Sequence, residues 1–119
     1  MERRTSLASS FRYAGEGLAF LVRTQRNARI ELALGAVAVI AALWLGVSPP
    51  EWAVLALTIA LVLILEGLNT ALEMAVDLAS PERNAVAKAA KDLSAGMVLI
   101  AALASVAVGA VIFLPRLVR

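Results

Sequence analysis

The chain has 119 residues, of which 61% are hydrophobic and 17% charged, and its formal net charge is +2. Soluble domains are about 45–50% apolar, so this composition indicates a membrane protein with one small domain. There is no cysteine and no histidine, which excludes disulfides, thiol nucleophiles, imidazole bases and histidine-bound metals. Any chemistry must use carboxylates, amides, hydroxyls, lysine and arginine, which suit hard cations and phosphates.

The N-terminal segment is predicted to form a helix lying on the membrane surface, over about residues 9–26. Apolar residues recur at helical spacing from Phe11 to Val22, while Arg12, Glu16 and Arg23 take other positions on the helical wheel. This segment is too short and too polar to cross a bilayer, which favours an interfacial amphipathic helix. The basic residues 23–31 that follow are interpreted as an elbow, and its arginines also suit lipid headgroups.

Three apolar stretches are predicted to span the membrane, over about residues 29–47, 52–78 and 92–115. Pro49 and Pro50 are expected to end the first of these helices in a tight turn. The last helix is expected to start with Ser80 as N-cap and Pro81 in its first turn, and to end at Pro115. The predicted fold is an all-α membrane protein, one domain over residues 1–119, with an interfacial helix followed by three transmembrane helices.

Basic residues are distributed unevenly around the predicted spans. Six arginines, including Arg3 and Arg4, precede the first span, the 48–52 turn has no basic residue, and the 80–92 connection has three. The positive-inside rule therefore predicts a cytoplasmic N-terminus, a cytoplasmic 80–92 connection and a C-terminus outside. Arg116 and Arg119 at the C-terminus argue for the opposite orientation but are outnumbered.

The second span ends in an acidic helical face. A helix turns about 100° per residue, which places Glu66, Thr70, Glu73 and Asp77 within about 60° of one another, with Asn69 beside them. The apolar residues 52–65 reach only about 21 Å at the helical rise, so Glu66 is expected at, or just inside, the membrane surface. Carboxylates so close to lipid are costly, which makes this face a candidate functional site.

The acidic face and the pair Lys91-Asp92 are expected on the same side of the membrane, where they suit Mg-nucleotide chemistry. Mg²⁺ takes one or two carboxylates plus phosphate oxygens, a lysine attracts phosphate, and a further carboxylate can take a proton from a hydroxyl. No Walker A motif or kinase glycine-rich loop is present. Two other functions remain open. In a small ion- or proton-coupled transporter the same acids would bind the transported ion, and in a non-enzymatic membrane assembly protein they would only mark where the helix leaves the membrane.

Three spans do not easily enclose a site. Small residues at Ala101, Ser105 and Gly109 are spaced four apart, which allows close helix approach. We therefore expect a homo-oligomer with sites at or between the subunits.

The pattern Glu66-Gly67-Leu68-Asn69-Thr70-Ala71-Leu72-Glu73-x-x-x-Asp77, followed by Lys91-Asp92-Leu93-Ser94-Ala95-Gly96, resembles the signature of the bacterial diacylglycerol kinase/undecaprenol kinase family. The similarity covers about residues 11–114 and includes Phe11-Arg12-Tyr13-Ala14 and Leu45-Gly46-Val47-Ser48. The resemblance implies transfer of the γ-phosphate of ATP, with Mg²⁺, to the hydroxyl of undecaprenol or diacylglycerol. The upstream segments favour undecaprenol. It also implies a homotrimer in the bacterial cytoplasmic (inner) membrane, with composite sites at subunit contacts and no nucleic-acid partner.

Site residues carry over from the resemblance by position. It implies that Glu66 is the general base with Asn69 beside it, that Glu73 binds the metal and hence ATP, and that the nucleotide is contacted by Tyr13, Glu82, Lys91 and Asp92. Three of these nucleotide contacts have a structural alternative: Lys91 as a membrane anchor, Asp92 as a helix-start acid, and Tyr13 as an interface aromatic.

One residue departs from the family pattern. The family usually carries a second metal-binding glutamate in a Thr-Glu-Arg-Asn-like stretch, whereas this chain reads Thr24-Gln25-Arg26-Asn27. Gln25 offers a carbonyl oxygen without negative charge, so metal affinity or activity is expected to be lower unless Glu31 compensates.

Overall fold

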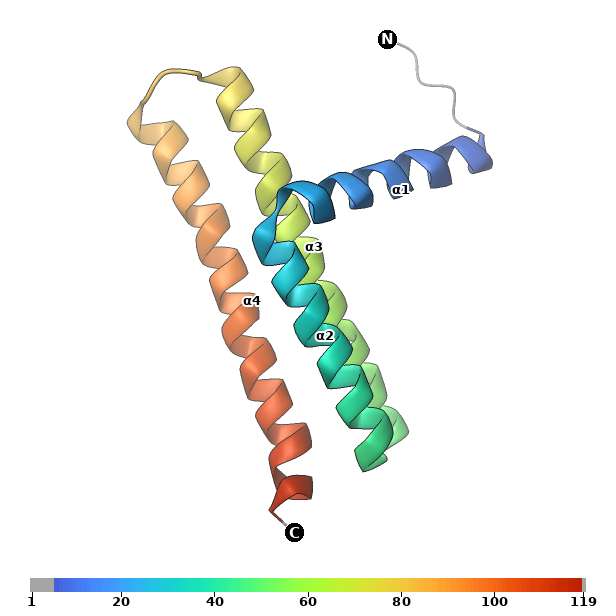
Figure 1. Ribbon diagram of the computed structural model, residues 1–119. Helices are drawn as coiled ribbons and strands as arrows, with labels where there is room; N and C mark the ends of the chain where they lie inside the picture. The colour runs from blue at the N-terminus through green and yellow to red at the C-terminus, as the bar shows by residue number, and fades with distance from the viewer. Residues whose placement is uncertain (1–5, 119) are drawn as a thin grey trace.

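The computed structural model describes residues 6–118, which form four helices: α1 (Leu7–Thr24), α2 (Arg26–Leu45), α3 (Pro49–Ala79) and α4 (Ala85–Leu117) (Figure 1). That part of the chain contains no strand. The helices α2, α3 and α4 are each long and apolar enough to cross a membrane. The predicted fold class is therefore confirmed. Arg3, Arg4 and Arg119, which entered the predicted orientation, lie outside the described residues.

The junction between α1 and α2 is a bend at a single residue. Gln25 has extended backbone angles (φ −112°, ψ 111°), and α2 begins at the next residue. Arg29 braces the bend, because its Nη1 donates to the carbonyl oxygens of Val22 and Arg23 at 2.8 and 3.1 Å. These carbonyls belong to the last turn of α1 and have no partner within the helix. The bend sends α1 away from the other helices at a steep angle (Figure 1).

The turn between α2 and α3 corrects the expected role of its prolines. Gly46 ends α2 in the left-handed conformation (φ 67°), which glycine adopts without strain. Ser48 caps α3, and its side chain and backbone form a capping box with Glu51. Pro49 and Pro50 fill the first turn of α3, where a missing N–H has no helical partner to lose. The prolines therefore begin the second span, and Gly46 ends the first.

The start of α4 also differs from the prediction. Ser80 closes α3, since its N–H donates to the carbonyl oxygen of Val76 at 2.8 Å. Its hydroxyl is used within the 80–84 connection, where it accepts a hydrogen bond from the Asn84 amide and donates to the Glu82 carbonyl. Asn84 is the N-cap of α4, and its Oδ1 accepts from the N–H of Ala87 at 2.8 Å. The predicted helix start at Ser80 and Pro81 is therefore wrong.

The predicted end of α4 at Pro115 is wrong as well, because the helix continues to Leu117. A proline lacks only its own N–H, so in the final turn the helix loses one hydrogen bond. The helices α3 and α4 run antiparallel beside each other (Figure 1). A small core near the α2–α3 turn contains Ala42, Leu55 and Ile112.

The crossing of α1 over α3 indicates where the acidic face stands relative to the membrane surface. A Cβ added to Gly67 would lie 3.6 Å from Cδ2 of Leu21 on α1, so α1 passes α3 directly beside Glu66. If α1 lies in the interface, as its sequence predicts, Glu66 is expected at the level of the membrane surface. Residues 68–79 then extend α3 about 18 Å beyond it.

Candidate functional site

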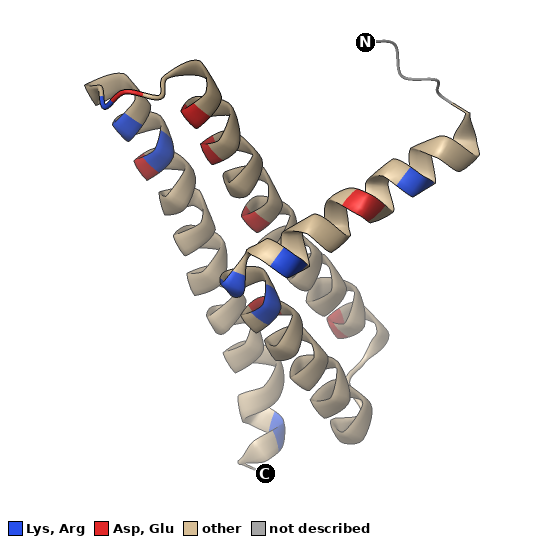
Figure 2. Ribbon diagram, turned by 45° about the horizontal axis from the view of Figure 1, so that its top comes forward, with Lys and Arg blue, Asp and Glu red and all other residues tan. Residues whose placement is uncertain are grey.

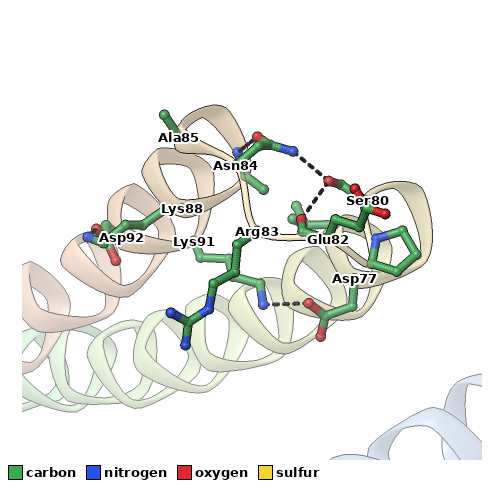
Figure 3. Close-up of a pocket in the computed structure, with 12 residues that line it drawn as sticks. Asp77, Ser80, Glu82, Arg83, Asn84, Ala85, Lys88, Lys91 and Asp92 are labelled. Atoms are coloured by element: carbon green, nitrogen blue, oxygen red, sulfur yellow. Dashed lines mark hydrogen bonds and ion pairs between the residues drawn. The ribbon is translucent and has the colours of Figure 1, made fainter.

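A cup of about 630 Å³ lies between the end of α3, the 80–84 connection and the start of α4 (Figure 3). Its lining includes six charged residues, and the acidic and basic positions at this end of the molecule gather on the two helices (Figure 2). These residues are Asp77, Glu82, Arg83, Lys88, Lys91 and Asp92. Glu82, Lys91 and Asp92 were predicted as site residues from the sequence, and the structure brings them into one cup.

Two ion pairs organise the cup. Lys91 Nζ lies 2.5 Å from Asp77 Oδ1 and so joins α4 to α3, as Figure 3 shows. Lys88 Nζ lies 2.6 Å from Asp92 Oδ2, one turn away on α4. Exposed ion pairs of this kind contribute little to stability, so a ligand can open them at little cost.

Arg83 and Lys88 line the cup although the sequence analysis used them only to predict orientation. Arg83 has no hydrogen bond or ion pair to any other residue in the 6–118 range, and its guanidinium extends over the cup in Figure 3. Their closeness in sequence to Lys91-Asp92, with Arg83 in the 80–84 connection and Lys88 on the first turns of α4, was the available signal. The cup thus contains the guanidinium of Arg83, which has no partner among the described residues, and two ion-paired lysines, Lys88 and Lys91.

A second group of polar atoms lies deeper, where α2 meets α3. Three buried oxygens there have no hydrogen-bond donor among the described residues: Glu31 Oε2, Glu66 Oε2 and Asn69 Oδ1. Glu66 is only 2% exposed, and its charge is close enough to those of Glu31 and Glu73 to interact with both. Because buried acceptors are normally paired, this group fits a ligand that brings a hydroxyl donor or a cation.

Glu73 connects the deep group with the cup. Its charge interacts with that of Glu66 on one side and with that of Lys91 on the other. The predicted acidic face thus runs along α3 from Glu66 through Glu73 to Asp77, which lines the cup. Thr70 does not take part, because its buried hydroxyl donates to the carbonyl oxygen of Glu66 at 3.0 Å.

Tyr13 and Gln25 stand apart from the residues that line the cup. Tyr13 lies on α1, where Arg12 stacks over its ring at 4.9 Å and donates to its hydroxyl at 3.1 Å. Gln25 occupies the α1–α2 bend, and its Nε2 donates to Thr24 Oγ1 at 3.2 Å. The side-chain carbonyl oxygen of Gln25, Oε1, is therefore the atom of this residue that can coordinate a metal.

The acids do not form a ready-made metal cage. No group of three Asp or Glu residues placed to hold a metal ion occurs between residues 6 and 118. Mg²⁺ is usually bound by one or two carboxylates together with water and substrate phosphates. Glu73 has no hydrogen bond or ion pair within the described chain, so its carboxylate is available as one such ligand.

A narrow apolar groove of about 170 Å³ runs between α2, α3 and α4, with Glu31 at its α2 N-terminal end. Ser105 and Gly109, which were expected at a subunit contact, line this groove within the chain. Ala101 is buried against the chain itself. The groove leads away from the deep carboxylates along the apolar helices, which suits a hydrocarbon chain.

Comparisons with known proteins agree with this arrangement. The sequence model of a family described as prokaryotic diacylglycerol kinase matches residues 12–113. A diacylglycerol kinase of Synechocystis sp. is 49% identical over 113 residues, which are 94% of this chain and 65% of that protein, so the chain spans slightly less than two thirds of this relative. An undecaprenol kinase of Bacillus subtilis is 40% identical over 108 residues, 91% of this chain and 88% of that protein.

Proposed function

We propose that this chain, which belongs to the prokaryotic diacylglycerol kinase family, is a bacterial membrane enzyme that transfers the γ-phosphate of ATP to the hydroxyl of a membrane lipid. The observation that carries the proposal is that Glu66, Glu73 and Asp77 follow one another along one face of α3, with Asp77 lining the cup. One end of this face is reached from the membrane surface and the other from water. A lipid alcohol and a nucleotide can therefore meet along it.

In the proposed reaction Glu66 is the general base. The lipid hydroxyl oxygen attacks the γ-phosphorus, the bond between that phosphorus and the β–γ bridging oxygen breaks, and ADP leaves with both electrons of that bond. The hydroxyl proton goes to Glu66, whose Oε2 has no donor in the described chain. Asn69 lies about one turn away on α3 and is proposed to help hold the lipid head group beside Glu66.

The nucleotide is proposed to bind in the cup. Lys91 and Arg83 attract its phosphates, since charge-assisted hydrogen bonds to phosphate are strong, and Asp92, Glu82 and Tyr13 contact the remainder. Glu73 and the side-chain carbonyl of Gln25 would hold Mg²⁺, which would neutralise charge at the phosphates. The electrostatic interactions of the Glu73 carboxylate with both Glu66 and Lys91 support this role.

The acceptor is proposed to be a long-chain membrane alcohol. Of the two relatives described above, one is named a diacylglycerol kinase and the other an undecaprenol kinase. Of the two lipids we favour undecaprenol, because the sequence of residues 11–14 and 45–48 favours it. The apolar groove beside Glu31, of about 170 Å³, can hold part of a hydrocarbon chain.

The proposed orientation places the N-terminus and the cup on the cytoplasmic side of the inner membrane and the C-terminus outside. We also propose a homotrimer. In a trimer, α1 of one copy can bring Tyr13 to the cup of another, which would account for the separation of Tyr13 from its own cup.

A transporter would use the same acids, and one experiment separates the two functions. Purified protein in mixed micelles is given Mg-ATP with or without undecaprenol or diacylglycerol, and ADP release is followed. The kinase predicts ADP release that depends on the lipid alcohol. A transporter predicts no lipid-dependent ADP release, together with a pH-dependent flux in proteoliposomes.

A further inference from the structure

The helices α3 and α4 are tied by an ion pair near each end. Near the α2–α3 turn, Arg116 Nη2 lies 2.6 Å from Glu51 Oε1 and Nη1 lies 2.8 Å from Glu51 Oε2. This bidentate contact is partly buried, with side-chain exposures of 19% and 26%. At the opposite end, Lys91 pairs with Asp77 inside the cup.

The spacing of these pairs defines one axial register. Asp77 follows Glu51 by 26 residues on α3 (77 − 51), and Arg116 follows Lys91 by 25 residues on α4 (116 − 91). At 1.5 Å per residue these segments are about 39 and 38 Å long, so antiparallel helices form both pairs together in a single register. A slip by one turn, about 5.4 Å, breaks both pairs.

The other contacts between α3 and α4 set this register only weakly. Apolar side chains in a membrane gain little from one apolar neighbour over another, because lipid tails solvate them equally well. The five-residue connection 80–84 can span up to about 16 Å, which leaves slack for a slip of one turn. Buried or partly buried polar pairs are the groups best known to fix helix register.

Glu51 and Arg116 are themselves held in place. Glu51 Oε1 accepts hydrogen bonds from the backbone N–H and the hydroxyl of Ser48 at 2.9 and 2.8 Å, so its carboxylate is fixed at the start of α3. Arg116 Nη1 also donates to the carbonyl oxygen of Ile112 at 3.1 Å. The contact is therefore anchored to the backbone of both helices.

We propose that Glu51 and Arg116 are positioning residues that set the register of α4 against α3, and thereby place Lys91 and Asp92 opposite Asp77 at the far end of the helix pair. Neither residue touches the reacting groups. The expected effect on nucleotide binding in the cup rests on the proposed function, whereas the expected effect on the register of α4 against α3 does not.

The test uses the double variant Glu51→Gln/Arg116→Met. Glutamine can still complete the capping box with Ser48, and replacing both partners of a partly buried pair leaves no unpaired charge, so the protein is expected to fold. The chain has no cysteine, which allows spin labels at Leu78→Cys and Leu93→Cys, two exposed positions on α3 and α4 near the cup. Labelled chains are diluted with unlabelled ones so that only distances within one chain are measured.

The parent is expected to give one narrow label-to-label distance. The double variant is expected to give a broader distribution with a component displaced by about one helical turn, and a several-fold higher KM for Mg-ATP at unchanged KM for the lipid. Arg116→Lys, which keeps one charged contact, is expected to retain most of the parent behaviour. Glu16→Gln, which removes an exposed acid of α1, is the control and is expected to change neither readout.

Each result decides part of the proposal. An unchanged distance distribution in the double variant would show that the ion pair does not set the register. A changed distribution with an unchanged KM for Mg-ATP would show that the register does not position the cup. Should the parent itself show no kinase activity, the proposed function fails, and the distance measurement still decides the register.

Discussion

Replacing Glu66 by glutamine separates the chemistry of the site from its folding. Glutamine has nearly the shape of glutamate but cannot take the proton of the attacking hydroxyl. Glu66 is 2% exposed, and its Oε2 has no donor in the described chain. The substitution therefore removes a charge that burial opposes and that Glu31 and Glu73 repel.

Glu66→Gln is expected to lower the catalytic rate without lowering the stability of the fold. General-base catalysis is worth about 10²–10⁴ in rate, so kcat is expected to fall by that factor, which corresponds to about 3–5 kcal/mol in the activation barrier. The melting temperature is expected to stay the same or to rise, because an unpaired buried carboxylate is replaced by a neutral amide. Nucleotide binding in the cup is expected to be unchanged, since Glu66 does not line it.

Three measurements on the same micellar preparation test this prediction: lipid-dependent ADP release at saturating substrates, thermal unfolding, and binding of a fluorescent ATP analogue. Glu16→Gln is the matched control, because it makes the same chemical change on an exposed surface. A variant that turns over at the parental rate would refute the base assignment. Loss of activity together with loss of folding or nucleotide binding would show that Glu66 is structural.

Two further predictions concern the metal and the nucleotide. Gln25→Glu adds a negative charge at the α1–α2 bend and is expected to lower the Mg²⁺ concentration that gives half-maximal rate; an unchanged Mg²⁺ dependence would mean that position 25 is not a ligand. Arg83→Gln removes the unpaired guanidinium of the cup and is expected to raise KM for Mg-ATP about 10- to 150-fold, with KM for the lipid unchanged, because a charge-assisted hydrogen bond is worth about 1.5–3 kcal/mol. Arg83→Lys is expected to be intermediate, and a parental KM in Arg83→Gln would place Arg83 outside the nucleotide site.

The sequence was sufficient for the helices themselves but not for their ends. Long apolar runs and the helical spacing in the N-terminal segment predict the four helices, because length and periodicity are local properties. The ends depend on which of several neighbouring residues caps the backbone. Ser80 and Asn84 are both good caps, and the structure uses Asn84 for α4 because the Ser80 hydroxyl is bonded within the connection.

The acidic face was predictable for a similar reason, whereas its partners were not. The positions of Glu66, Glu73 and Asp77 on one face follow from helical geometry alone. The pairing of Lys91 with Asp77, and of Arg116 with Glu51 across 65 residues of sequence, depends on how α4 lies against α3. The proximity of Glu31 to Glu66 likewise depends on the packing of α2 against α3. These contacts require the assembled helices.

The central claim is the transfer of the terminal phosphate of ATP to a lipid alcohol, and labelled ATP tests it most directly. Purified protein is incubated in mixed micelles with undecaprenol or diacylglycerol, Mg²⁺, and ATP labelled with ³²P at either the γ- or the α-phosphate. We predict that label from γ-labelled ATP appears in the extracted lipid and that label from α-labelled ATP does not. The absence of lipid-bound label with both alcohols would contradict the account.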